Sequence, residues 1–297
     1  MALPVVADSL AGRLAVITLL PFAQAELAGT PGDLLDHLFD GGALPPAVNP
    51  VVGEALRARV LQGGYPEALR RTSASRRQAW LEDYVALSLD RDVRDIANID
   101  QLDRMPRLLD VLAPHAGQLV NHSSYGAALG LTAPTAQKYV RILERLFLLR
   151  QVPPWSPPST YSAVSRLTKT PKLHFLDTGL LAALRGDTAA QLQKDRTGYG
   201  PLLERFVVSE VLKLATWSEQ RLRTSHFRTK DQGEVDLVIE DLRGLRQLQA
   251  AVGDKFVYGL VLHDHDRITP FDEKRHAVPV SMLWEAGGGL AQKIASP

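Results

Sequence analysis

The hydrophobic positions of the chain recur at helical spacing over most of its first half. Apolar residues three or four apart predict helices at residues 51–61, 75–98 and 101–112. Ser75 is the expected N-cap of the long second helix. The stop signals are Gly-Gly-Tyr-Pro after the first helix and Pro114 with Gly117 after the third. Ahead of them, a short apolar strand is expected at residues 14–20 and a helix after Pro21.

Residues 118–150 carry the clearest local pattern. A short stretch of small residues predicts one helix, capped by Ser123 or Ser124, and Gly130 makes a turn. Thr132 then caps a longer helix, with Pro134 in its first turn, where proline is tolerated. A short helix, a glycine turn and a capped longer helix predict a helix-turn-helix at about residues 119–147.

Two apolar segments after this motif, residues 147–155 and 172–178, predict the paired strands of a wing. The segment at residues 153–162 is rich in Pro and Ser and is expected to form the wing loop or a linker. The sequence therefore predicts a winged helix in the middle of the chain.

The outer face of the second helix of the motif is where DNA contacts are expected. Basic side chains contact phosphates and polar side chains contact base edges. Glu144 and the uncharged residues 133–136 dilute the positive charge, so a protein-binding or purely structural winged helix stays an equal alternative. The candidate DNA-contacting residues are Thr135, Gln137, Lys138, Arg141 and Arg145.

The last block, residues 200–285, contains both helical spacing and the alternating spacing of strands. A helix is expected at residues 201–215 and a hairpin at 226–240, with its turn at 231–233. A further helix at residues 244–252 and a buried strand at 256–262 complete an α-β-β-α-β order, which indicates a small α/β layer.

Four carboxylates in this block are candidates for one site. Glu210 falls in the middle of an apolar helical stripe, where a carboxylate needs a partner, and Glu204 flanks the stripe. Glu234 and Asp236 share one face of the second hairpin strand. If two or three of them converge on a divalent cation, they form a hydrolytic site. The alternative is a solvated strand face and one hydrogen-bonded glutamate.

A hydrolytic site of this kind also needs a lysine, and the downstream sequence supplies only a poor candidate. The sequence Asp272-Glu273-Lys274 follows a proline in a polar segment and is expected to be a surface loop. The run His263–Asp266 suggests a metal but ends a strand and reads as polar loop. No metal site is predicted from either segment.

The composition of the chain excludes several classes of function and site. The 34 Lys and Arg balance 33 Asp and Glu, so a nucleic-acid surface has to be a local patch. The chain has no cysteine, which excludes disulfides and cysteine-based zinc sites. It has no phosphate-binding loop and no G-x-G-x-x-G, so no cofactor is predicted from the sequence. Without a signal peptide or membrane span, a cytoplasmic location and no membrane partner are expected.

Several stretches together resemble a known family, in order over nearly the whole chain. They are SLAGR, LLPFAQAEL, GGYPEAL, RDVRDIANI, LGLTAPTAQKYVRILERLFLL, KTPKLHFLDTGL, LLERFVVSEVLK and HFRTKDQGEVDLVIE. They resemble the prokaryotic AAA-type ATP-binding proteins that carry a C-terminal domain of unknown function, family 4143.

The resemblance implies an ATPase domain that binds ATP and Mg²⁺, then a winged helix, then a domain similar to PD-(D/E)xK nucleases. The expected fold is therefore α+β and multidomain. Residues 1–70 are the end of the ATPase domain and its helical lid, 71–180 the helical region with the winged helix, and 181–297 the reduced nuclease-like domain.

This sequence departs from the family pattern at both ends. The phosphate-binding loop is missing, so Arg13, which matches an arginine that faces nucleotide in the family, has nothing to act on. The strand with Glu-x-Lys between residues 241 and 244 is missing too. Residues 1–45, without the ATPase strands, are expected to be poorly packed or to borrow a partner.

Three functions stay open. The leading one is a truncated, non-catalytic member of this ATP-binding family that binds DNA or a protein, or forms a homo-oligomer. The second is a Mg²⁺-dependent nuclease that uses Glu204 or Glu210 together with Glu234 and Asp236. The third is a winged-helix transcriptional regulator.

Overall fold

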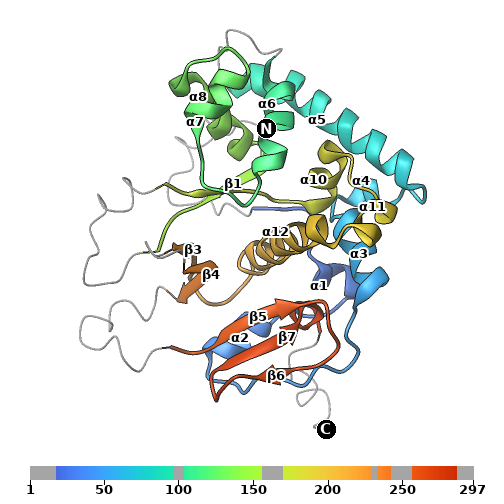
Figure 1. The fold of residues 1–297 in the computed structure, drawn as a ribbon, viewed down its shortest axis with the longest axis vertical. Coiled ribbons are helices and arrows are strands. Elements are labelled where there is room, and N and C mark those ends of the chain that lie inside the picture. The colour runs from blue at the N-terminus through green and yellow to red at the C-terminus, as the bar shows by residue number, and fades with distance from the viewer. Residues whose placement is uncertain (1–17, 97–103, 156–169, 229–232, 242–255, 286–297) are drawn as a thin grey trace, which may run out of the picture.

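A computed structural model gives the chain a mixed α+β fold (Figure 1) and describes residues 18–96, 104–155, 170–228, 233–241 and 256–285. Several predictions lie outside these residues. They are Arg13, most of the strand at 14–20, the hairpin turn and the helix at 244–252.

The first half of the chain is helical, as the periodicity predicts. Helices α3 and α6 end within a residue of their predicted ends, but α5 begins one residue before Ser75. Ser75 therefore lies inside the first turn and is not the N-cap. The helices are α1 (Gln24–Ala28), α2 (Leu34–Phe39), α3 (Gly53–Gln62), α4 (Pro66–Leu69), α5 (Ala74–Ile96) and α6 (Arg104–Leu112), followed by the 3₁₀ turn η1 (Ala113–His115).

The predicted helix-turn-helix is present as α7 (His122–Ala128) and α8 (Ala133–Arg145). The Thr132 side chain accepts a hydrogen bond from the Thr135 amide, so the predicted cap of α8 is confirmed. The cap of α7 is Asn121, which accepts from the Ser124 amide. The prediction of Ser123 or Ser124 is wrong because both serines lie inside the helix that Asn121 begins.

The wing strands are also confirmed. Strands β1 (Leu149–Val152) and β2 (Lys172–Phe175) pair in an antiparallel ladder. Leu119, just before α7, forms an isolated antiparallel bridge to Lys172 on the other side of β2. The helix-turn-helix and its wing are thus joined through backbone hydrogen bonds.

The last block begins with helices and ends in two small sheets. Strands β3 and β4 form an antiparallel hairpin, and β5 lies parallel to β7, which also pairs with β6. The elements are α10 (Thr178–Arg185), α11 (Ala189–Lys194), α12 (Arg196–Leu214), β3 (Leu222–Arg228), β4 (Glu234–Asp241), β5 (Gly259–His263), β6 (Thr269–Pro270), β7 (Arg275–Pro279) and the 3₁₀ turn η4 (Val280–Leu283).

Two predictions for this block need correction. Helix α12 starts at Arg196, five residues before the predicted start, because Asp195 caps it and Pro201 is accommodated inside. Strand β5 is not buried: Val261 is 56% exposed, since this strand lies at the edge of a sheet with only one face against the core.

One hydrophobic core includes residues from all three predicted domains, 1–70, 71–180 and 181–297. Leu35, Leu108, Phe206 and Trp284 belong to the same buried cluster. Residues 18–45 are therefore not poorly packed, contrary to expectation: Ala23, Ala25, Leu34 and Leu38, among others, are buried. Helix α12 and the C-terminal end of the described chain provide that packing surface, and the Thr30 hydroxyl donates to the Trp284 carbonyl.

No helix within the described ranges has the length and apolar character that crossing a membrane requires.

Candidate functional site

Helix α8 presents a row of cations away from the core. Its apolar face, including Tyr139, Val140 and Leu143, is buried. Lys138, Arg141 and Arg145 are exposed, and their spacing of three and four residues places them along one face of the helix. Thr135 and Gln137 are partly exposed near its N-terminal end.

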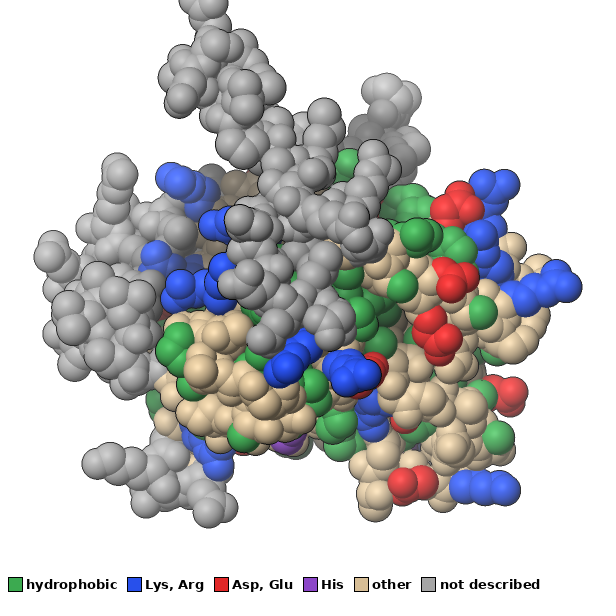
Figure 2. Space-filling view, turned by 90° about the horizontal axis from the view of Figure 1, so that it is seen from above, with side chains coloured by type: hydrophobic (Ala, Val, Ile, Leu, Met, Phe, Trp, Pro, Cys, Tyr) green, Lys and Arg blue, Asp and Glu red, His purple; other side chains and the backbone are tan. Residues whose placement is uncertain are grey.

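One side of the helical end of the molecule is more basic than the chain as a whole. Figure 2 looks down on the helical end of the molecule. Of the charged side chains visible in its left half, nearly all are Lys or Arg, whereas acids and bases are mixed on the right. A local basic patch of this kind is what a chain of nearly neutral charge needs in order to bind nucleic acid.

Two contacts hold the motif in shape. Glu144, which dilutes the charge of α8, accepts from the backbone amide and the side-chain amide of Gln151 on β1 at 2.8 and 2.7 Å. The Arg104 guanidinium, at the start of α6, donates to the Leu129 carbonyl at 2.6 Å and so holds the turn between α7 and α8. Glu144 therefore connects the second helix to the wing.

Glu234 and Asp236 of β4 converge on a lysine of the wing, 64 residues before Asp236 in the chain. The Lys172 ammonium, at the start of β2, forms ion pairs with Glu234 and, at 3.0 Å, with Asp236. We call these three residues the wing cluster. Burial alone would lower the pKa of Lys172, but the two carboxylates outweigh that effect and raise it. The Lys172 hydrogen bond lowers the pKa of Glu234.

Glu204 of α12 lies close enough to this cluster to be influenced by it. Burial, together with the negative charge of Asp236, raises the pKa of Glu204. Its neighbour Arg205 is buried and donates to the Ala116 carbonyl at 2.5 Å. Two of the four predicted acids, Glu234 and Asp236, thus meet at Lys172, and Glu204 is near enough for their charge to affect its pKa.

Several buried polar groups lie on β2 and β3, the strands next to the wing cluster. His174 of β2 is completely buried, and neither ring nitrogen has a hydrogen-bond partner among the described residues. Burial and the charges of Lys172 and Arg205 lower the pKa of His174 to about 3. The Ser225 hydroxyl and Nδ1 of His226, both on β3, are also buried without a described partner.

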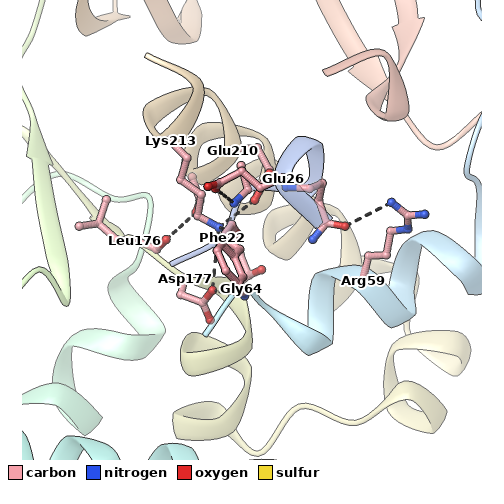
Figure 3. A network of polar contacts seen from close by, with 12 residues as sticks. Phe22, Glu26, Arg59, Gly64, Leu176, Asp177, Glu210 and Lys213 are labelled. Atoms are coloured by element: carbon pink, nitrogen blue, oxygen red, sulfur yellow. Dashed lines mark hydrogen bonds and ion pairs between the residues drawn. The ribbon is translucent and has the colours of Figure 1, made fainter. Parts of the chain in front are cut away.

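Glu210, the fourth predicted acid, lies elsewhere. Figure 3 shows it beside Lys213, which donates to it at 2.8 Å, while Asp177 lies 3.9 Å from the same ammonium. We call these three residues the buried cluster. Burial raises the pKa of Glu210, and Lys213 opposes that shift only in part. Glu210 therefore has its own partners, Lys213 and the Gln24 amide, which fits the alternative of one hydrogen-bonded glutamate.

Backbone amides complete the buried cluster. Asp177 caps α10 by accepting from Leu180 and also accepts from Gly64 at 2.6 Å, while Glu210 accepts from Gln24 at 2.6 Å. A Cβ on Gly64 would meet the Phe22 carbonyl at 2.0 Å, so only glycine fits this approach. Four of the stretches that carry the family resemblance, beginning at residues 19, 63, 169 and 202, meet here.

The two weaker candidates behave as polar turns. Asp272 accepts from the amides of Lys274 and Arg275, which makes the predicted surface loop between β6 and β7. Asp264, in the His263–Asp266 run, accepts from the Gly53 amide at 2.5 Å and ties this segment to α3. The described residues contain no group of three or more His, Asp or Glu side chains arranged to hold a metal ion.

Sequence reasoning missed Lys172 and Lys213 for different reasons. Lys172 lies 64 residues from Asp236, and no local pattern connects them. Lys213 lies three residues after Glu210, a spacing that brings side chains together on a helix. This spacing could have predicted the ion pair from the sequence.

Comparisons with known proteins give families but no activity. Residues 53–191 match a family described as a domain of unknown function, DUF8612, and residues 199–241 match another, DUF4143. The second is the family that the sequence resembles. Neither description mentions nucleotide binding. No solved structure shows a significant match.

Two curated relatives cover part of the chain. Uncharacterized proteins of Mycobacterium bovis and Mycobacterium tuberculosis are each 28% identical to it over 191 residues. The matched region is 64% of this chain and 41% of each relative, so the chain spans less than half the length of these relatives.

Proposed function

We propose that the chain is a non-catalytic nucleic-acid-binding module and that its winged helix binds duplex DNA. The observation that carries this proposal is the exposed row Lys138, Arg141 and Arg145 on α8. A helix of this motif enters the major groove while neighbouring cations contact phosphates. The wing is joined to the same helix through Glu144.

We further infer that the module is the C-terminal portion of an AAA-type ATP-binding protein. The match of residues 199–241 to the resembled family and the greater length of the relatives support this origin. The chain itself has no phosphate-binding loop. Equilibrium titration of the purified chain with ATP and Mg²⁺ is expected to detect no binding, and saturable binding would overturn the non-catalytic assignment.

Loss of one cation from α8 tests DNA binding. Arg141→Ala and Lys138→Ala are each expected to weaken binding to a labelled duplex and to reduce the salt slope of the affinity by about one, because each removes about one phosphate contact. Fluorescence anisotropy at several salt concentrations measures both quantities.

Arg70→Ala is the matched control, because Arg70 is an exposed cation just after another helix, α4, and is paired with Glu67. It is expected to leave affinity and salt slope unchanged. If the wild-type chain fails to bind any duplex, or if the α8 variants bind as it does, DNA is not the ligand of this face and a protein partner takes its place.

A Mg²⁺-dependent nuclease is the second candidate, and Lys172 is the observation that favours it. The sequence lacks a Glu-x-Lys strand, yet a lysine reaches Glu234 and Asp236 from β2. Such a lysine can stabilise developing negative charge. Plasmid cleavage with Mg²⁺ or Mn²⁺ that is lost in Asp236→Ala would support this candidate, and absence of cleavage with both metals removes it.

A further inference from the structure

The β3–β4 hairpin contacts both strands of the wing beyond their paired residues. After β1 ends, the chain continues beside β3: the His226 amide donates to the Pro153 carbonyl at 2.9 Å, and the Trp155 amide donates to the His226 carbonyl at 2.6 Å. These two bonds form the parallel bridge between Pro154 and His226. One side of the wing is thus bonded to the hairpin through its backbone.

The other side of the wing is held by side chains of the same hairpin. The His226 ring lies 3.3 Å from the Thr170 carbonyl, so His226 contacts both sides of the wing. Two residues later, Lys172 forms its ion pairs with Glu234 and Asp236. The hairpin therefore lies across the end of the wing strands next to the wing loop and bonds to each side.

Trp155 adds a third contact of a different kind. Its indole nitrogen donates to Glu240 of β4 at 3.0 Å, and its ring meets Phe227 of β3 edge to face, with centroids 5.6 Å apart. Backbone bonds, ion pairs and an aromatic contact are independent interactions that hold the same two parts together.

We propose that the β3–β4 hairpin positions the wing for nucleic acid, with Lys172, Glu234 and Asp236 as positioning residues. This inference rests on the proposed DNA binding by the winged helix. The Lys172 side chain is only 4% exposed, so it does not reach a phosphate itself. The wing cluster acts through the place it gives to β1 and β2 next to α8, so the β3–β4 hairpin affects nucleic-acid binding through the wing.

Two variants of opposite charge separate positioning from simple electrostatics. Lys172→Met removes a positive charge, and the double variant Glu234→Gln, Asp236→Asn removes two negative charges. If charge alone acts, the first weakens DNA binding and the second strengthens it. If the cluster positions the wing, both weaken binding, by about fivefold or more. Lys194→Met, an exposed lysine on α11, is the charge-matched control and is expected to bind like the wild type.

The same variants have a readout that does not depend on DNA. Hydrogen exchange of the β1 and β2 amides, residues 149–152 and 172–175, is expected to become faster in both. Hydrogen exchange of the α12 amides is expected to stay as in the wild type in these variants. The Lys194→Met control is expected to keep the melting temperature of the wild type. Affinities are measured well below the melting temperature of each variant, so that a loss of folded protein does not contribute.

The outcomes separate the two proposals. Opposite changes in affinity, or unchanged affinity in both variants while Arg141→Ala still weakens binding, overturn the positioning role. Unchanged exchange in β1 and β2 overturns the hold of the hairpin on the wing. Failure of the wild-type chain to bind DNA overturns the proposed function, and with it the role of the hairpin in recognition.

Discussion

The wing cluster and the buried cluster have the same chemistry in different surroundings. Each consists of one buried lysine and two carboxylates. In the buried cluster, Asp177 and Glu210 have side chains 1% and 2% exposed. In the wing cluster, Glu234 and Asp236 are 36% and 46% exposed. Water therefore solvates the carboxylates of the wing cluster, whereas those of the buried cluster depend on the protein for every hydrogen bond.

The difference explains what each cluster does for the fold. Buried charges are stable only when they are paired and hydrogen-bonded, and the buried cluster meets this need with amides from the N-terminal segment, the turn after α3 and the start of α10. It holds distant segments in one fixed arrangement. The wing cluster faces water, so its ion pairs can be exchanged for hydration at lower cost. That property suits a joint between two parts.

The largest expected effect is on the buried cluster. Lys213→Met leaves two carboxylates buried without their cation and is expected to lower the free energy of unfolding by about 3–5 kcal/mol. Urea unfolding followed by circular dichroism measures this loss. The double variant Glu210→Gln, Lys213→Met is expected to recover much of it, because the uncompensated charge on Glu210 is gone. A single variant that costs less than about 1 kcal/mol would show that this cluster, too, is solvated.

The second expected effect is on pH dependence, at His174 beside the wing cluster. Its pKa in the folded protein is about 3, below the ordinary 6.5, so folding favours the neutral ring. The stabilisation is complete above pH 6.5 and is lost as the pH falls towards 3. Between pH 7 and 5 this amounts to about 2 kcal/mol of unfolding free energy. The lowered pKa of His226 adds a change of the same sign.

Urea unfolding at pH 7 and pH 5 checks this slope, and His174→Leu is the matched variant. Leucine fills the buried site without a titrating group, so the loss of stability between the two pH values should be smaller by about 2 kcal/mol than in the wild type. An equal loss in both proteins would assign the acid sensitivity to other groups.

The two clusters also mark how far sequence reasoning reaches. The helix-turn-helix was predictable because its signals are local: the apolar spacing of α8, the Thr132 cap and the turn at Gly130 lie within a few residues of one another. The caps at Ser75, Ser123 and Ser124 were wrong because several residues that can cap a helix stand side by side, and packing selects among them.

Contacts between distant segments were beyond the sequence. The apolar stripe around Glu210 correctly indicated a carboxylate in need of a partner, but its amide donor, Gln24, lies 186 residues away. The packing of residues 18–45 depends on α12 and the last described residues, which no local pattern connects to them. Only the i, i+3 partner Lys213 was within reach.

The smallest expected effect is on the wing cluster. Lys172→Met is expected to lower the free energy of unfolding by no more than about 1 kcal/mol, because the two carboxylates are left in water and exposed ion pairs contribute little. The comparison with Lys213→Met is direct, since the substitution is the same. Because salt screens exposed charges, the small difference from the wild type should shrink further at about 1 M NaCl, whereas that of Lys213→Met should persist.

Equal losses in the two variants, or equal sensitivity to salt, would mean that exposure of the carboxylates does not decide the strength of these clusters. The hairpin would then be a fixed part of the core, not a joint that positions the wing.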